Sequence, residues 1–463
     1  MLSWKPLQDA SAFRAYCKGI GKDIKEYDDI AKNIEIYEDD PKWRKLIADS
    51  KIFVGVIESV SESPCFAEGV KVRTTSGYRN IEDISVGDYV FTHKGRYRRV
   101  TRLYQKYGRN LLKVKCMGSV PFLATANHPF LVRSRDGNNY VKIGKRCYKT
   151  IRKFSNPYWK ECSELKKGDY IAHPVNSESI IPCGDLPFDD ERFWWIVGRY
   201  IGDGWCRIQK NKHHLGSSYH VFICCNKKDN ECKEIEENLD GIFYYTKTEE
   251  KTTFRYDISS FAFHSYLTQF GKYANGKKIT DDILNLPIEL LKSFIDGYIS
   301  ADGYKPQNRN SVYITTVSKD LSLGIQECIH KCYKKPTTLV FVKKEKIRPS
   351  LLEDGRAIEA KNDIYTISFA SGSRYQNGFY EDGYMWLPFR SIEETGLDEL
   401  VYNFSVEEDE SYTVENIAVH NCSMLLYDKP VRKELGMIRT SKGEICCMLD
   451  GLNCDHYKYL KND

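Results

Sequence analysis

The chain has 463 residues, of which 41% are hydrophobic and 29% charged, enough apolar material for two to four folded domains. No stretch approaches the roughly 20 apolar residues that a membrane-spanning helix needs, and residues 1–6 lack the pattern of a signal peptide. The 16 cysteines are spread along the chain, so we expect reduced thiols rather than a disulfide scaffold. These features exclude a membrane protein and predict a cytoplasmic, multi-domain protein.

Charge is distributed unevenly along the chain. Lysine and arginine minus aspartate and glutamate gives 23 − 9 = +14 over residues 65–180 and 1 − 9 = −8 over residues 385–421. Residues 186–384 are nearly neutral. Opposite charge on two distant segments favours their assembly into one unit, and a nucleic-acid footprint in the basic segment is the alternative.

The pattern of residues changes three times along the chain. Residues 1–64 predict mixed helix and loop, whereas residues 65–180 show short alternating strands separated by turns. Within that β segment, residues 84–90 resemble residues 165–171, each with a Gly-Asp pair between strands. A duplicated β unit explains this repeat.

Residues 181–384 predict a mixed α/β region with an internal repeat. Two apolar helical stretches, 193–203 and 290–302, end alike in Ile-Gly-Asp-Gly and Ser-Ala-Asp-Gly, which indicates two pseudo-equivalent halves. Strands return over residues 385–421. The predicted fold class is therefore multi-domain: an all-β domain interrupted by an α/β domain, with the divisions 1–64, 65–180, 181–384, 385–421 and 422–463.

Three short motifs mark the all-β material. Cys65 opens it, Thr125-Ala126-Asn127-His128 lies inside it, and His420-Asn421-Cys422 closes it. Together with the two Gly-Asp turns, they resemble an intein, a self-splicing Hint domain, over residues 65–421. The resemblance implies a horseshoe-like, pseudo-two-fold β fold flanked by host segments at residues 1–64 and 422–463.

The resemblance implies a role for each motif at the first junction. A thiol is the best uncharged nucleophile near neutral pH, so Cys65 would attack the Pro64 carbonyl and form a thioester. His128 would act as a general acid on the departing nitrogen, and Thr125 would orient the scissile peptide. No cofactor is needed, because each exchange is close to neutral in energy.

The second junction would complete the reaction. Cys422 would take the acyl group, and the amide nitrogen of Asn421 would attack its own carbonyl and release the host. His420 would assist by polarising that carbonyl or relaying a proton. Inteins commonly have Asp where this chain has Asn403, which cannot transfer a proton. A mechanistic role for Asn403 and a purely structural one remain equal alternatives.

The insertion resembles a LAGLIDADG homing endonuclease. Small residues at Gly198 and Gly202, and at Gly297 and Ala301, are spaced i and i+4, which allows two helices to approach closely. The resemblance implies that Asp203 and Asp302 lie side by side at the helix ends, bind Mg²⁺ and cut double-stranded DNA carrying the uninterrupted host site. Lys278 would polarise the attacking water, and a monomer with two unlike halves would read an asymmetric site. Ordinary core helices are the alternative.

Two groups of basic residues are candidates for binding DNA phosphates. A solvated loop is an equal alternative for each group. The first group lies in the insertion and consists of Lys343, Lys344, Lys346 and Arg348. The second group lies in the β domain and consists of Lys142, Lys145, Arg146, Lys149, Arg152 and Lys153.

The flanking segments are short. Joined at Pro64 and Cys422, they resemble a phage or bacterial DNA polymerase III alpha subunit, which would make the chain a fragment of a longer product. A Hint-type autoprocessing domain that cleaves without ligation, with an inactive endonuclease, is the alternative. A free-standing endonuclease would not need Cys65.

Overall fold

The computed structural model describes residues 64–421 except 143–147, 211–215, 228–230, 309, 352–356 and 371–376, together with residues 438–439 and 445–446. Pro64–Ser423 forms one compact unit, and residues 1–63 and 424–463 belong to another. In the second, only the paired strands β27 (Ile438–Arg439) and β28 (Ile445–Cys446) are described. The predicted host segments thus lie almost wholly outside the described residues. No helix within these limits is long and apolar enough to cross a membrane.

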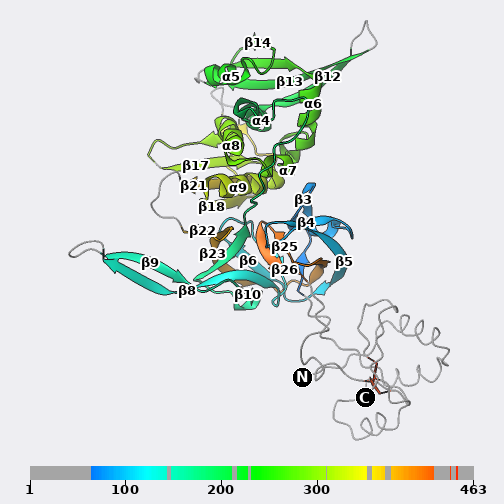
Figure 1. Ribbon diagram of the computed structural model, residues 1–463, viewed down its shortest axis with the longest axis vertical. Coiled ribbons are helices and arrows are strands. Elements are labelled where there is room, and N and C mark those ends of the chain that lie inside the picture. Colours follow the sequence, from blue (N-terminus) through cyan, green and yellow to red (C-terminus); the bar gives the residue numbers. More distant parts are fainter. Residues whose placement is uncertain are drawn as a thin grey trace, which may run out of the picture. The chain divides into compact units, whose positions relative to one another are not determined.

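A sixteen-stranded antiparallel sheet forms the β domain (Figure 1). Its main path runs β10-β8-β11-β23-β6-β7-β1-β24-β5-β4-β2-β25-β26, and β26 pairs again with β8, so the path closes on itself. The strands are β1 (Phe66–Ala67), β2 (Lys71–Thr74), β3 (Gly77–Asn80), β4 (Tyr89–Phe91), β5 (Tyr97–Gly108), β6 (Leu112–Cys116), β7 (Phe122–Ala124), β8 (Pro129–Lys142), β9 (Tyr148–Phe154), β10 (Tyr158–Glu161), β11 (Asp169–Pro174), β22 (Phe379–Glu381), β23 (Tyr384–Glu394), β24 (Glu399–Val406), β25 (Ser411–Val414) and β26 (Ile417–His420).

The two ends of the β domain meet in the middle of this sheet. Phe66 of β1 pairs with Ala124 of β7 on one side and with Tyr402 of β24 on the other. Apolar and polar residues alternate along strands such as β6, so every second side chain points into the core. Phe66 is fully buried in this core, which places the first residues of the domain beside its last strands.

Ion pairs join the basic and acidic segments of the β domain. Arg96 contacts Asp409 at 2.6 Å and Glu408 at 3.1 Å, and Lys94 contacts Asp409 at 3.1 Å. Burial alone would raise the pKa of Asp409, but hydrogen bonds from these side chains and from Thr92 lower it overall. The opposite charges of the two segments therefore serve their assembly into one unit.

The predicted duplication is visible in two matching turns. Each has a 3-10 helix, η2 (Ile81–Asp83) or η3 (Cys162–Glu164), followed by a glycine with φ of 99° or 107°. Each aspartate after that glycine accepts one hydrogen bond from the backbone three residues earlier and one from a basic side chain nine residues earlier. The donors are Ser85 N and Arg79 for Asp88, and Lys166 N and Lys160 for Asp169. Lys160 is therefore a buried structural cation rather than part of a basic surface.

The inserted domain has two halves of the same topology, as the sequence predicts. In each half a long helix is followed by two strands, a second helix and two more strands, and these four strands form one antiparallel sheet. The second half also has a separate pair of short strands between the last two strands of its sheet. The first half comprises α4 (Glu191–Asp203), β12 (Trp205–Lys210), β13 (Ser217–Asn226), α5 (Glu231–Leu239), β14 (Tyr245–Glu249), β15 (Thr253–Ser259) and α6 (Phe261–Leu267). The second comprises α7 (Asp281–Leu284), α8 (Ile288–Asp302), β16 (Gly303–Tyr304), β17 (Ser311–Thr316), α9 (Lys319–Tyr333), β18 (Thr337–Val342), β19 (Ser350–Leu351), β20 (Ala357–Ile358) and β21 (Ile364–Ala370).

Helices α4 and α8 pack backbone against backbone. A Cβ atom at Gly198 would lie 2.0 Å from the carbonyl oxygen of Phe294, and one at Gly297 would lie 2.0 Å from that of Trp195. No side chain fits at either position, so the small residues of the repeat are a steric requirement of the helix pair. This packing brings the C-terminal ends of the two helices together.

Candidate functional site

Thr125 forms hydrogen bonds with both backbone groups of Cys65, and one of these is the nitrogen of the peptide bond before Cys65. The Cys65 backbone N–H donates to Thr125 Oγ1 at 2.9 Å, and the Thr125 N–H donates to the Cys65 carbonyl at 3.0 Å. Cys65 is fully buried at the start of β1. Thr125 follows β7, whose pairing with β1 sets this register. The structure thus brings two of the predicted splicing residues together on the nitrogen of the first junction.

Asn403 on β24 contacts the other side of the same bond. Its Nδ2 donates to the carbonyl oxygen of Pro64, while its Oδ1 accepts from the Tyr412 hydroxyl at 2.8 Å and from the Phe404 N–H at 2.7 Å. These two donors orient the amide so that its N–H points at Pro64. The sequence analysis left the role of Asn403 open, and it did not identify Tyr412.

His128 lies between the two predicted junctions. Its ring is fully buried, 3.9 Å from the Phe66 ring centroid. Burial lowers its pKa well below the usual range, the nearby His420 lowers it further, and backbone groups of His420 and Cys65 oppose the shift. The imidazole is therefore neutral, so it must take up a proton before it can act as the predicted general acid.

The second junction lies at the end of β26. His420 Nδ1 is 3.0 Å from the Asn421 carbonyl oxygen, and the Asn421 N–H donates to the Glu410 carbonyl at 2.8 Å. The Trp159 ring packs edge-on against His420, with centroids 5.0 Å apart. Trp159 was not identified as a site residue from the sequence, where it is one aromatic among basic residues. Cys422 lies outside the described residues.

A second centre is formed by Asp203 and Asp302, which end α4 and α8. A Cβ atom at Gly202 would lie 2.2 Å from the Ala301 Cβ and 3.6 Å from the Asp302 Cγ, so the two helix ends are in contact. Burial raises the pKa of both acids, and the charge of Asp203 contributes to the value of about 6 for Asp302. The predicted pair of acids is therefore brought together by the glycines.

Lys277, rather than Lys278, lies at these acids, which corrects the sequence prediction. The Lys277 ammonium donates to the carbonyl oxygens of Ile201 at 2.6 Å and Gly202 at 3.0 Å. Burial lowers its pKa, and the charges of Asp302 and Asp203 oppose that shift. Lys278 instead donates to the Ser76 carbonyl in the β domain at 3.2 Å. The backbone is extended at Lys277, so neighbouring side chains point in opposite directions.

Arg199 is a further buried cation of the same centre. It lies one helical turn before Asp203 and donates to Glu231 Oε2 at 2.7 Å and to Asp203 Oδ2 at 3.3 Å. A third bond, to the Ser300 carbonyl at 2.5 Å, joins α4 to α8. An arginine four residues before the acid, in the otherwise uncharged run of residues 193–202, is the sequence signal that could have identified it.

The donor set at this centre suits a hard divalent cation. The Asp203 side chain is 43% exposed, and its charge raises the pKa of Asp302, so the two carboxylates are close enough to repel each other. The described residues contain no group of three or more His, Cys, Asp or Glu side chains that could enclose a metal. Two carboxylates fit Mg²⁺, which completes its shell with water and phosphate oxygens.

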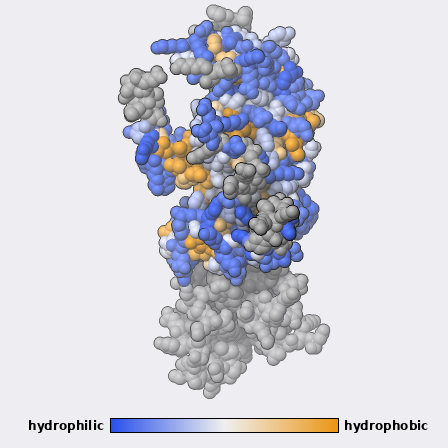
Figure 2. Space-filling view, turned by 90° about the vertical axis from the view of Figure 1, so that its left-hand side faces the viewer, coloured by the Kyte–Doolittle hydropathy of each residue, from blue (hydrophilic) through white to orange (hydrophobic). Residues whose placement is uncertain are grey.

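The predicted DNA-binding residues occupy two exposed places. Lys343, Lys344, Lys346 and Arg348 follow β18 and are all exposed. Of the second group, Lys142, Lys149, Arg152 and Lys153 lie on the β8–β9 hairpin, which extends beyond the rest of its sheet (Figure 1). There Lys142 is exposed, Lys153 lies 3.8 Å from Asp136, and Arg152 donates to the Tyr170 hydroxyl at 3.2 Å. Lys145, Arg146 and the Lys149 side chain lie outside what the structure describes. Among the coloured residues in Figure 2, hydrophilic ones cover most of the visible surface.

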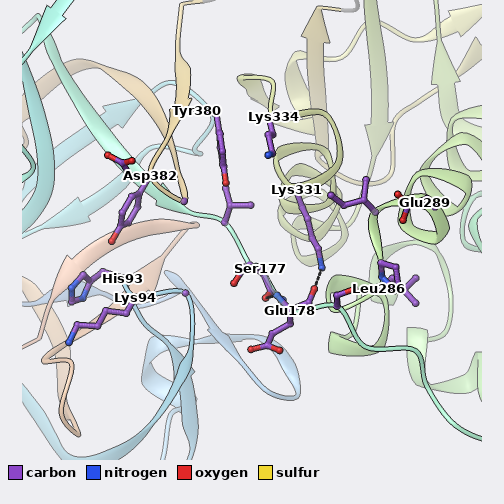
Figure 3. Close-up of a pocket in the computed structure, with 18 residues that line it drawn as sticks. His93, Lys94, Ser177, Glu178, Leu286, Glu289, Lys331, Lys334, Tyr380 and Asp382 are labelled. Carbon is purple, nitrogen blue, oxygen red and sulfur yellow. Dashed lines mark hydrogen bonds between the residues drawn. The ribbon is translucent and has the colours of Figure 1, made fainter.

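A cavity of about 430 Å³ lies where the β domain meets the insertion (Figure 3). His93, Lys94 and Asp382 line it from the β domain, Lys331 lines it from α9, and Lys334 lines it from the position directly after α9. None of the predicted splicing or nuclease residues lines this cavity. It therefore belongs to the junction between the domains rather than to either centre.

Two family models match the chain, one in each domain. A Hint domain model matches residues 64–116, and a LAGLIDADG-like domain model matches residues 289–335. The first match includes Cys65, and the second includes the end of α8 with Asp302. The family resemblances that the sequence predicts are thereby confirmed.

The curated relatives have different names. An iron-sulfur cluster assembly SufBD family protein of Mycobacterium tuberculosis is 24% identical over 396 residues, covering 82% of this chain and 45% of that protein. An ATP-dependent DNA helicase of Thermococcus kodakarensis is 24% identical over 432 residues, covering 79% of this chain and 37% of the helicase. The chain spans less than half the length of these relatives, so it shares a segment with them rather than a whole protein.

Solved structures with partial similarity include a mutant of the Ssp DnaB mini-intein, 13% identical, with a TM-score of 0.26 over 78% of this chain and 99% of that one. Mesophilic variants of the homing endonuclease I-DmoI are 17% identical, with a TM-score of 0.28 over 39% of this chain and 83% of that one. By the two family models, this chain carries a Hint domain and a LAGLIDADG-like domain, the domain composition of an intein with an inserted homing endonuclease.

Proposed function

We propose that the chain is a precursor that excises residues 65–421 and ligates its flanking segments. The observation that carries the proposal is that each junction carbonyl has its own donor: Asn403 Nδ2 at Pro64 and His420 Nδ1 at Asn421. Both carbonyls must accept negative charge when attacked, and a donor already in place stabilises that charge. Because His128 is close to the backbone of both Cys65 and His420, one neutral base serves both ends.

The first step is a shift of the acyl group from nitrogen to sulfur. His128 takes the thiol proton of Cys65, and the sulfur attacks the Pro64 carbonyl carbon while Asn403 donates to its oxygen. His128 then gives the proton to the Cys65 nitrogen, and the carbon–nitrogen bond breaks. Asn403 is a permanent donor, whereas an ionised Asp would repel the developing oxyanion. The replacement therefore favours this step and removes a proton carrier from later ones.

The later steps transfer the chain and release the domain. The Cys422 thiolate takes the acyl group from Cys65, which forms a branched chain. The Asn421 amide nitrogen then attacks its own carbonyl carbon, His420 polarises the carbonyl oxygen, and the nitrogen of Cys422 leaves with a proton. A final sulfur-to-nitrogen shift restores a peptide bond between Pro64 and Cys422.

Mass spectrometry of the purified full-length chain tests this proposal. Splicing gives a 357-residue product (421 − 65 + 1) and a ligated product of 106 residues (463 − 357). Cys65→Ala should abolish ligation while leaving slow cleavage after Asn421, and Asn421→Ala should leave thiol-induced cleavage before Cys65. Cleavage of the unmodified chain without the 106-residue product would favour the autoprocessing alternative.

For the inserted domain we propose site-specific cutting of double-stranded DNA. Asp203 and Asp302 would hold a divalent cation, which supplies Lewis-acid stabilisation at the phosphate and an activated water. Lys277 would orient the attacking group, and Arg199 would keep Asp203 ionised. The basic residues after β18 and on the β8–β9 hairpin would bind phosphates. Asp302→Asn should abolish cutting of DNA carrying the joined host site, whereas a competent Asp302→Asn variant would contradict the assignment.

The host protein stays a proposal from the junction sequence alone, a DNA polymerase III alpha-like subunit. The matched relatives carry several unrelated names, and a DNA polymerase of Thermococcus litoralis is 24% identical over 274 residues, which are 16% of its length. Peptide mapping of the ligated product together with the longer gene sequence would test the host assignment.

A further inference from the structure

The hairpin that leads to Asn421 contains a strained turn. Glu415 and Asn416 connect β25 to β26, and their φ angles are 50° and 65°. Two consecutive left-handed residues form the type of turn that prefers Asn-Gly, and a glutamate pays a steric cost in that conformation. The turn therefore depends on contacts from outside the hairpin.

Backbone groups of Lys71 on β2 form hydrogen bonds with Glu415, with the Lys71 N–H donating to Glu415 Oε1 at 2.9 Å. Helix α9 of the inserted domain supplies further contacts. Asn416 Nδ2 donates to the Leu323 carbonyl at 3.0 Å and to Gln326 Oε1 at 2.9 Å. The Lys319 ammonium lies 2.6 Å from Glu415 Oε1, and the Glu415 side chain is fully buried. A buried carboxylate without a cation is strongly destabilising, so Lys319 is required for the glutamate to stay in the turn.

The same helix is fixed against the β domain by a second buried network. Arg73 of β2 is 1% exposed and forms an ion pair with Glu327 of α9. The Tyr78 hydroxyl lies 3.1 Å from Glu327 Oε2 and 2.6 Å from Asn416 Oδ1, so it joins this ion pair to the turn. Docking of α9 and the conformation of the turn are therefore coupled through shared side chains.

Helix α9 also fixes the segment that leaves the β domain. Figure 3 shows Lys331 reaching across the cavity to the Glu178 carbonyl, and the same ammonium donates to the Leu284 carbonyl at 2.8 Å. The position of α9 is thus set on both sides of the junction between the domains. A displacement of the helix would move the turn with it.

We propose that the inserted domain is part of the splicing apparatus, with Lys319 and Gln326 as positioning residues for the second junction. This inference rests on the proposed splicing function. Strand β26 has four residues, and its last, His420, pairs with Ser411 of β25. In so short a strand, the angle of the hairpin at its turn sets where His420 meets the Asn421 carbonyl. Cyclisation of Asn421 thus needs α9, whereas the first junction is held by β1, β7 and β24.

The test compares the two junctions in the full chain. Lys319→Ala combined with Gln326→Ala should slow cleavage after Asn421 about tenfold, the effect expected for the loss of buried hydrogen bonds. Thiol-induced cleavage before Cys65 should change by less than about threefold in the same variant. Lys292→Ala combined with Gln209→Ala, at exposed positions of the same domain, is the matched control and should leave both rates unchanged. Thermal unfolding of each variant identifies any general loss of folding.

Rescue distinguishes positioning from a general structural role. Glu415→Asn with Asn416→Gly gives the turn a sequence that adopts the left-handed conformation unaided and removes the buried acid. Added to the Lys319 and Gln326 substitutions, these changes should restore cleavage after Asn421 and the ligated product. Equal slowing of both junctions, or failure of this rescue in a folded chain, would overturn the inference. Absence of splicing in the unmodified chain would instead refute the proposed function.

Discussion

Burial opposes charge at both centres, but only the acids at the ends of α4 and α8 have buried cations beside them. At the splicing junctions, Cys65 and His128 are fully buried, and burial leaves the imidazole neutral. At the ends of α4 and α8, burial also opposes charge on Asp203 and Asp302, yet two buried cations are placed beside them. A reaction that moves a proton between neighbouring atoms needs no fixed charge, whereas one on DNA phosphates needs acids that remain able to bind a cation.

The comparison predicts the largest effect at Lys277. Lys277→Met removes the cation that bonds the last carbonyls of α4 and faces both acids, so DNA cutting should fall by about a hundredfold or more. The neighbouring Lys278→Met is the matched control, because that side chain contacts Ser76 of the β domain. Cutting of a plasmid carrying the host site measures both variants. Equal losses in the two variants would show that neither lysine acts at the acids.

The close contact of α4 and α8 should be the next most sensitive feature. Gly198→Ala places a methyl group 2.0 Å from a backbone carbonyl, so the helices must separate. We expect the free energy of unfolding to fall by about 1–3 kcal/mol and cutting to be lost. Gly276→Ala is the control, because a Cβ atom there meets nothing within 4 Å. Urea denaturation measures the difference, and equal stability of the two variants would contradict the steric argument.

The sequence predicted the residues of the two centres that lie in short motifs, but not those whose role depends on side-chain direction or on packing between strands. Short motifs pointed to Cys65, Thr125, His128 and the two helix-end acids, because each motif can be recognised within a few consecutive residues. The sequence prediction named Lys278, whereas the structure places Lys277 at the helix ends. In an extended segment alternate side chains point to opposite sides, and the sequence alone does not show which side faces the acids. It also missed Tyr412, whose role appears only when β25 packs beside β24.

Domain limits and interfaces were predicted less completely. Strand β22 already belongs to the large sheet, slightly before the predicted limit at residue 385, because a three-residue strand has too little alternation to be recognised. The contacts of α9 with the Glu415–Asn416 turn join residues about 90 positions apart. These residues belong to no recognisable sequence motif, so their contacts are found only in the folded structure.

At the splicing centre, Tyr412→Phe should have a moderate effect. The hydroxyl orients the Asn403 amide toward the Pro64 carbonyl, and without it the amide can rotate and lose its bond to that oxygen. We expect thiol-induced cleavage before Cys65 to slow about tenfold, with cleavage after Asn421 less affected. Tyr104→Phe, which removes a hydroxyl bonded to Ser405 on the same strand as Asn403, is the control. Equal rates in the two variants would assign Asn403 a structural role.

Acid should weaken the junction between the domains. His173 of β11 and His330 of α9 are fully buried with ring centroids 5.8 Å apart, and burial lowers the pKa of His173 to about 3. Each histidine binds a proton more readily in the unfolded chain than in the folded one. The free energy of unfolding therefore keeps its full value above pH 6.5 and falls as the pH drops below it. The loss is at most about 1.4 kcal/mol per pH unit for each histidine. His173→Phe should flatten the fall measured by thermal unfolding between pH 7 and pH 5, and an unchanged slope would contradict the assignment.

The smallest expected effect is a difference in salt dependence, which separates the centres most directly. At the first junction Thr125, His128 and Asn403 are buried and uncharged, so added salt has no fixed charges to screen there, and the splicing rate should stay constant within about twofold between 50 and 200 mM salt. DNA binding should weaken steeply over the same range, because each phosphate contact releases a counterion. Lys343→Gln and Lys346→Gln should each lower the slope of log affinity against log salt by about 0.9. Fluorescence anisotropy with a labelled duplex measures the slope, and gel analysis measures splicing in the same buffers. An unchanged slope would assign these lysines to a solvated surface, and a salt-sensitive splicing rate would show that charge takes part at the junctions after all.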